Sequence, residues 1–264
     1  MAGKILVYTL HKCASTFLHR FCQELCDETR LRLVSVNDPA FCPAIRNGGY
    51  YANFFDHGDV FAPIRVFEPP PGGARSIIQL RDPRDLLVSN YFSLCYSHGT
   101  LIPGAERLMM ARYPVDPARR INWQEQGVDS FVLECAPLYA GRFEEYLSFA
   151  SARDIPIVRY EDMVLDFDEW AETFLEAIGY LKYAPVLIER LRSEIAIPLV
   201  EDKTMHKRRV TPGDHAVKLM PATIASLNHT FNDVLERLDY PRSIASTVPG
   251  VTRAAGRVQS SEPA

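Results

Sequence analysis

The sequence predicts an α/β fold: a single domain with a central, mainly parallel sheet flanked by helices. Short apolar runs, typical of strands buried on both faces, alternate along the chain with segments whose apolar residues recur at helical spacing. The chain has 264 residues, of which 47% are hydrophobic. This length and composition suffice for one large core.

The net charge of the chain disfavours some classes of binding partner. A formal net charge of -4 and a pI near 6.0 disfavour nucleic acid and anionic membranes, because such binding depends on clustered Lys and Arg. The first residues, MAGKILVYTL, are too short an apolar run for a membrane span or a signal peptide core. The six cysteines form no CxxC pair, which favours buried, reduced thiols. We therefore expect a cytoplasmic protein with local anion sites and no metal site.

The first unit is a strand followed by a helix. Residues 4–10 (KILVYTL) form a nearly continuous apolar run, which predicts a buried strand that ends at HKCAST. In the helix that follows, Phe17, Phe21 and Leu25 recur every fourth residue. We expect Ser15 or Thr16 to cap its start.

A second strand is predicted at residues 30–36 (RLRLVSV), followed by Asn37 and Asp38. The stretch from Pro39 to Pro71 is irregular and rich in aromatic residues, with a short strand expected around VFAPIRVF (residues 60–67). Such a stretch suits the wall of a small-molecule site.

Residues 76–98 predict a strand, a tight turn and a helix, with Asp82 as N-cap and Pro83 at the first helical position. Further along, a core strand is expected in residues 155–163, a helix from residue 168 that ends at Gly179, and further helix in residues 221–240. The polar sequence after residue 242 predicts a domain spanning residues 1–242 and a flexible tail over 243–264.

The junction HKCAST is a candidate anion site. Backbone N–H groups and the positive end of a helix dipole would face a ligand above Lys12 to Thr16, where Lys12 adds a charge. The segment differs from a Walker loop, because the lysine precedes the small residues and no GxxxxGK[ST] pattern is present. A magnesium-bound triphosphate is therefore not the expected ligand.

Two further segments are suited to anions. Arg81 comes at the end of a strand and Ser89 follows about two helical turns later, so both side chains can converge on one phosphate. Residues 203–218 (KTMHKRRVTPGDHAVK) form a basic segment in an acidic chain. Three such segments favour one ligand with more than one phosphate-like group.

Together these segments resemble the PAPS-dependent sulfotransferase family over most of residues 4–240, which implies a P-loop-NTPase-like sulfotransferase architecture. HKCASTF is similar to the family's 5'-phosphosulfate loop, Lys-Ser-Gly-Thr-Thr-Trp. The positions that match it in order are Lys12, Cys13, Ala14, Ser15, Thr16 and Phe17. Cys13-Ala14 replaces Ser-Gly, with the loss of one side-chain donor.

The resemblance extends to the other segments. Arg81 and Ser89 match the pair that binds the 3'-phosphate, and the similarity of VRYEDM to Tyr-Glu-Asp-Met implies that Tyr160 contacts the adenine. Arg208, Arg209 and Gly213 resemble the family's late Arg-Lys-Gly-x-x-Gly-Asp loop, with Val210 in place of the first glycine. The implied cofactor is PAPS (3'-phosphoadenosine 5'-phosphosulfate), and the product is 3',5'-ADP.

The resemblance predicts in-line transfer of a sulfuryl group to a hydroxyl or amine of a small-molecule acceptor, with Lys12 neutralising the leaving phosphate. Three residues are candidates for the general base, in the order Asp38, His57, Glu68. A nucleotide-dependent small-molecule kinase and a non-catalytic nucleotide-binding module remain alternatives.

Overall fold

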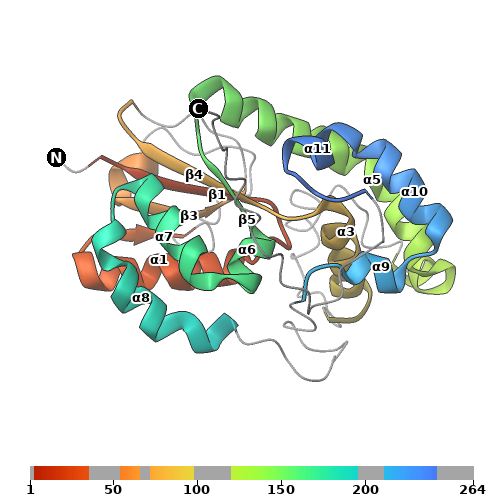
Figure 1. The fold of residues 1–264 in the computed structure, drawn as a ribbon, viewed down its shortest axis with the longest axis horizontal. Coiled ribbons are helices and arrows are strands. Elements are labelled where there is room, and N and C mark those ends of the chain that lie inside the picture. Colours follow the sequence, from red (N-terminus) through yellow and green to blue (C-terminus); the bar gives the residue numbers. More distant parts are fainter. Residues whose placement is uncertain (1–2, 36–53, 66–71, 98–119, 196–210, 243–264) are drawn as a thin grey trace, which may run out of the picture.

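The computed structural model describes residues 3–35, 54–65, 72–97, 120–195 and 211–242. Within them the chain forms one five-stranded sheet with the strand order β2-β3-β1-β4-β5. The strands are β1 (Ile5–Thr9), β2 (Leu33–Val34), β3 (Val60–Ile64), β4 (Arg75–Leu80) and β5 (Ile157–Arg159). All four pairings are parallel, which confirms the predicted α/β fold (Figure 1).

The carboxyl ends of these strands define one edge of the sheet. All five residues of the central strand β1 are buried, as expected for a strand with helices on both faces. Its first residue, Ile5, pairs with Val60 of β3 and with Arg75 of β4, so the three strands start level. Whatever follows β1, β3, β4 and β5 therefore meets at the same edge.

One face of the sheet is covered by four helices (Figure 1). These are α1 (Ser15–Thr29), α6 (Tyr160–Leu165), α7 (Phe167–Ile178) and α8 (Ala184–Leu191). Their core is partly aromatic: the ring of Phe21 in α1 lies 5.1 Å from Trp170 and 5.2 Å from Phe174 of α7, measured between centroids. This packing fixes the start of α1 relative to the sheet.

The opposite face is covered by a second set of helices. It includes α3 (Pro83–Phe92), α5 (Arg120–Arg153), α10 (Pro221–Thr230) and α11 (Asn232–Arg237). The hydroxyl of Tyr146 in α5 donates to the carbonyl of Thr9, 3.0 Å away, so α5 is tied to the end of β1. Helix α5 contains a kink at Gly127, whose φ is 86°.

Short helical segments complete the described structure. They are η1 (Phe54–His57), η2 (Ser93–Ser97), η4 (Leu181–Tyr183), η5 (Arg192–Ile195) and α9 (Asp214–Lys218). The strand expected at residues 30–36 comprises Leu33–Val34, and residue 36 lies outside the described residues. Helices α5, α6, α8 and α9 were not predicted, and the strand expected at residues 155–163 is shorter, because α6 begins at Tyr160 directly after β5.

Helix boundaries test the capping predictions. The side chain of Asp82 accepts a hydrogen bond from the backbone N–H of Arg84, so the predicted cap of α3 is confirmed. Gly179 ends α7 in the left-handed conformation, as predicted. The cap predicted for α1 is wrong: the N-cap position is Ala14, which makes no side-chain hydrogen bond. Ser15 is instead the first residue of the helix, and its hydroxyl accepts a hydrogen bond from Arg65, 2.6 Å away.

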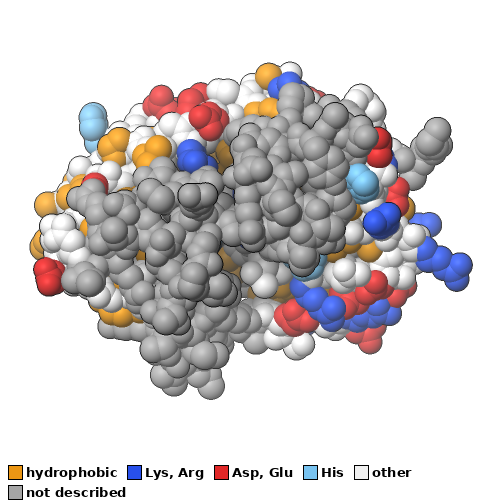
Figure 2. Space-filling view, turned by 180° about the vertical axis from the view of Figure 1, so that it is seen from behind, with side chains coloured by type: hydrophobic (Ala, Val, Ile, Leu, Met, Phe, Trp, Pro, Cys, Tyr) orange, Lys and Arg blue, Asp and Glu red, His pale blue; other side chains and the backbone are white. Residues whose placement is uncertain are grey.

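The cysteines and the surface complete this description. Five cysteines, Cys13, Cys22, Cys26, Cys95 and Cys135, are buried and reduced. None of the helices among the described residues has the length and apolar character needed to cross a bilayer. Where described residues are visible in Figure 2, basic and acidic side chains are interspersed.

Candidate functional site

The loop between β1 and α1 has an unusual backbone. Lys12 and Ala14 both have positive φ, 69° and 60°, which is the left-handed conformation that residues with a Cβ rarely adopt. Alternating left-handed residues are typical of backbone nests, in which successive N–H groups face an anion. Helix α1 begins directly after this loop, at Ser15, so its free N–H groups add to the site.

The loop is held from below by side chains of the neighbouring strand. Nε2 of Gln79 in β4 donates to the carbonyl of Cys13 at 2.8 Å, and Nη1 of Arg81 donates to the carbonyl of Lys12 at 3.2 Å. Burial raises the pKa of the Cys13 thiol to about 12. Cys13 is therefore a neutral core residue, and its two neighbours hold the loop carbonyls away from an anion.

A basic residue that the sequence analysis did not select lies beside this loop. Arg65 directly follows β3, and its Nη2 donates to Oγ of Ser15 at 2.6 Å. Its guanidinium is thus placed at the first turn of α1. The sequence contains a signal for it, because Arg65 is a cation immediately after a buried apolar run that forms the strand next to β1.

Arg81 lies at the centre of the second part of the site. It is 4% exposed, and its guanidinium carbon lies 4.2 Å from the centroid of the Tyr160 ring. Burial lowers its pKa, but Tyr160, Asp85 and Glu161 outweigh that effect and raise it. Its Nε is buried and has no hydrogen-bond partner among the described residues. A buried, charged and partly unpaired guanidinium is a candidate anion ligand.

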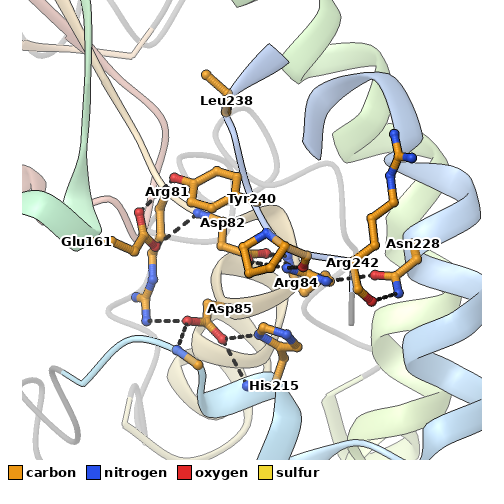
Figure 3. Close-up of polar contacts among 12 residues, drawn as sticks. Arg81, Asp82, Arg84, Asp85, Glu161, His215, Asn228, Leu238, Tyr240 and Arg242 are labelled. Carbon is orange, nitrogen blue, oxygen red and sulfur yellow. Dashed lines mark hydrogen bonds and ion pairs between the residues drawn. The ribbon is translucent and has the colours of Figure 1, made fainter. Parts of the chain in front are cut away.

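Glu161 joins three segments of the chain (Figure 3). Its Oε1 accepts from the backbone N–H of Asp82 at 3.1 Å, and its Oε2 accepts from the hydroxyl of Tyr240 at 2.7 Å. Burial, reinforced by the charge of Asp82, raises the pKa of Glu161 to about 7. This carboxyl group therefore titrates close to neutral pH while it positions the turn that carries Arg81.

The turn after β4 is also fixed by an internal ion pair. Nη2 of Arg84 lies 2.6 Å from Oδ2 of Asp82, and both side chains are buried. Arg84 also donates to Oδ1 of Asn228 at 2.7 Å and to the carbonyl of Pro241 at 2.9 Å. The last described residues of the chain are thus attached to this turn (Figure 3).

The described end of the basic segment meets α3 at Asp85. Oδ2 of Asp85 accepts from the backbone N–H of Gly213 at 2.6 Å. Oδ1 accepts from the backbone N–H of His215 at 2.9 Å and lies 2.6 Å from Nδ1 of its ring. Burial raises the pKa of Asp85, but hydrogen bonds from His215 and the charge of Arg81 outweigh it and lower the pKa to about 2.

The structure brings together some of the residues selected from the sequence. Lys12, Ser15, Arg81, Tyr160 and Gly213 all belong to segments that meet at the carboxyl edge of the sheet. Two others are in helices near this edge: Thr16 is exposed in the first turn of α1, and Ser89 is half-buried in α3. Phe17 packs against α7, where its ring centroid lies 5.8 Å from that of Phe167.

The general-base candidates are not all at this edge. His57 ends η1, before β3 begins, and the carbonyl of the next residue, Gly58, accepts a hydrogen bond from Lys4, which precedes β1. These contacts place His57 at the amino edge of the parallel sheet, so the structure does not bring it to Lys12. Asp38, Glu68, Arg208 and Arg209 lie outside the described residues.

Comparisons with known proteins concern the fold. No family model matches the sequence, and no curated protein matches it. Among solved structures, the chain is similar to mouse sulfotransferase SULT7A1 complexed with PAP, with a TM-score of 0.56 and 16% identity over 90% of this chain and 86% of that chain. It also matches the sulfotransferase domain from the curacin biosynthetic pathway, with a TM-score of 0.45 and 12% identity over 91% of this chain and 99% of that domain. With its parallel sheet, its loop after β1 and its turn after β4, the chain therefore has the sulfotransferase fold.

Proposed function

We propose that this protein is a PAPS-dependent sulfotransferase that transfers a sulfuryl group to a hydroxyl or amine of a small molecule. One observation carries the proposal: the buried Arg81 contacts the loop after β1 through the carbonyl of Lys12 and stacks on Tyr160, and its Nε has no hydrogen-bond partner among the described residues. A single guanidinium thus joins the segments proposed to bind the two ends of the nucleotide. That the similar mouse sulfotransferase was solved with PAP supports the same assignment.

The proposed cofactor contacts follow the three segments. The 5'-phosphosulfate would lie in the loop from Lys12 to Phe17, against the backbone of Cys13 and Ala14 and the hydroxyls of Ser15 and Thr16. Arg81 and Ser89 would bind the 3'-phosphate together with Arg208, Arg209 and Gly213, and Tyr160 would contact the adenine. Such preorganised N–H groups and cations suit a dianionic group without a metal ion.

In the proposed reaction the acceptor oxygen or nitrogen attacks sulfur in line with the bond to the departing 5'-phosphate oxygen. Lys12 and the loop N–H groups would stabilise the charge that develops on this oxygen. Arg65, 2.6 Å from Ser15, is positioned to add a second cation there. Asp38 and Glu68 stay candidates for the general base, whereas the position of His57 argues against it.

Calorimetric titration of the metal-free protein tests the cofactor assignment. We expect 3',5'-ADP to bind more tightly than 5'-AMP or magnesium ATP. Arg81→Ala should weaken 3',5'-ADP binding at least about a hundredfold, because hydrogen bonds to charged groups contribute about 1.5–3 kcal/mol each.

Arg75→Ala is the matched control, since Arg75 begins the same strand at the opposite edge and donates to the carbonyl of Ile178 at 2.8 Å. This variant should bind normally. A preference for magnesium ATP would contradict the proposal and favour a kinase. Release of 3',5'-ADP from PAPS that depends on an acceptor would exclude a non-catalytic binding module.

A further inference from the structure

We infer that His215, acting through Asp85, is a positioning residue that makes the site selective for a nucleotide with a 3'-phosphate. This inference rests on the proposed function and adds a specificity-determining pair to it. Asp85 lies in α3 close to Arg81, and His215 lies in α9, 130 positions later in the sequence (Figure 3).

Asp85 has two possible partners for its charge. One is His215, whose Nδ1 lies 2.6 Å from Oδ1. The other is Arg81, whose Nη2 lies 4.0 Å from Oδ2, beyond hydrogen-bond distance. The side chains of Asp85 and Arg81 are 1% and 5% exposed, so water does not screen this competition.

Asp85 is hydrogen-bonded to the segment that contains His215 and not to Arg81. Three donors, the backbone N–H groups of Gly213 and His215 and the imidazole ring, occupy both oxygens of Asp85. A carboxylate satisfied in this way does not draw the guanidinium of Arg81 into a close ion pair. Arg81 then keeps hydrogen-bond donors for an anion. One of them is its buried Nε, which has no partner within the part of the chain that the structure describes.

The same contacts fix the end of the basic segment. Gly213 adopts a φ of 84°, a left-handed conformation that suits glycine. In this turn the backbone N–H groups of Gly213 and His215 both point at Asp85. Farther along, Nζ of Lys218 lies 5.5 Å from the ring centroid of Phe92 in α3. Contacts with two residues of α3, Asp85 and Phe92, thus hold residues 213–218 beside Arg81, where we place the 3'-phosphate.

The test is the ratio of two affinities in variants of His215. His215→Phe keeps a ring in the buried space but removes the donor to Asp85, so Arg81 should close onto the carboxylate. We expect the affinity for 3',5'-ADP to fall about tenfold or more, with 5'-AMP binding unchanged, because 5'-AMP has no 3'-phosphate. His215→Asn, which retains a side-chain N–H donor, should restore most of the ratio. His215→Ala serves as a second variant without added bulk and should behave like His215→Phe.

Asn228→Ala is the matched control. It removes another contact between α3 and the C-terminal part of the chain, through Arg84, but does not touch Asp85 or Arg81. It should lower stability and leave the affinity ratio unchanged. If the wild type is selective and His215→Phe is equally selective, or loses both affinities together, the inference is overturned while the proposed function stands. A wild type that binds both nucleotides equally overturns the proposed function and this inference with it.

Discussion

The two halves of the proposed nucleotide site are built in different ways. The loop after β1 is shaped by its backbone, with left-handed residues at Lys12 and Ala14 and carbonyls held by Gln79 and Arg81. The turn after β4 is shaped by charged side chains, among them the buried Asp85 and the half-buried Glu161. Anion binding by backbone N–H groups does not depend on neighbouring side chains such as those of Cys13 and Ala14, whereas binding by a side chain is lost when that side chain is replaced. We therefore expect Cys13 and Ala14, which differ from the phosphosulfate loop that the sequence resembles, to tolerate replacement better than Arg81.

The ionisable side chains of the two halves differ in their pKa shifts. Burial keeps Cys13 neutral, with its pKa raised to about 12. On the other side, the pKa of Asp85 is lowered to about 2 and that of Glu161 is raised to about 7. Changes of pH near neutrality therefore act on the side-chain half, through Glu161.

Lys12→Ala tests whether the backbone half needs the charge of Lys12 for the reaction, in addition to that of Arg65. A preorganised donor to developing charge is worth about 3–4 kcal/mol, so turnover should fall on the order of a hundredfold or more. Binding of 3',5'-ADP should fall much less than in Arg81→Ala, because the backbone N–H groups remain. Release of 3',5'-ADP from PAPS measures the rate. Lys4→Ala, at the opposite end of β1, is the control. A rate like that of the wild type would remove Lys12 from the mechanism.

Glu161→Gln tests the electrostatics of the side-chain half. The pKa of Glu161 is raised from 4.5 to about 7 in the folded protein, mainly by burial, so the folded state binds a proton that the unfolded state releases. The free energy of unfolding of the wild type should therefore fall as pH rises from about 4.5 to 7. Glutamine does not titrate. The stability of the variant relative to the wild type should rise by about 2–3 kcal/mol between pH 4.5 and 8.

Urea unfolding at these two pH values measures the difference. Glu172→Gln, an exposed change on α7, is the control and should show no comparable trend. A stability difference between Glu161→Gln and the wild type that does not depend on pH would show that the pKa of Glu161 is the same in the folded and unfolded protein.

Ala14→Gly tests the backbone half and should have the smallest effect. Ala14 has a φ of 60°, which costs alanine roughly 1 kcal/mol that glycine does not pay. The greater flexibility of unfolded glycine offsets part of this gain. We expect a stabilisation below about 1 kcal/mol with 3',5'-ADP binding preserved, measured by thermal unfolding and titration. Ala171→Gly in the interior of α7 should be destabilising instead. A weaker nucleotide site in Ala14→Gly would mean that the alanine side chain itself matters.

Local signals in the sequence predicted much of this fold. Buried apolar runs marked β1, β3, β4 and β5, and capping residues marked α3 at Asp82 and the end of α7 at Gly179. These features depend on residues close together in the chain. The cap of α1 was misassigned: Ser15 is the first residue of the helix and is hydrogen-bonded to Arg65, fifty positions away, a contact that a local pattern does not contain.

The contacts that shape the site could not be predicted for the same reason. Gln79 and Cys13 are 66 positions apart, and His215 and Asp85 are 130 apart. Each residue alone is unremarkable in the sequence, and its role depends on where parallel strands end side by side. Helix α5 was missed although it is long, since its kink at Gly127 and its internal Pro137 interrupt the helical pattern.

The thiol of Cys13 can be used to measure how often the loop after β1 opens. The side chain is completely buried under the loop, so a thiol reagent reaches it only during moments when the loop opens. The rate of modification at this position, read by mass spectrometry of the peptide that contains it, therefore reports how often the loop opens. If the proposed nucleotide occupies the loop, it should slow this reaction in proportion to its occupancy, so binding could be followed before any acceptor is known.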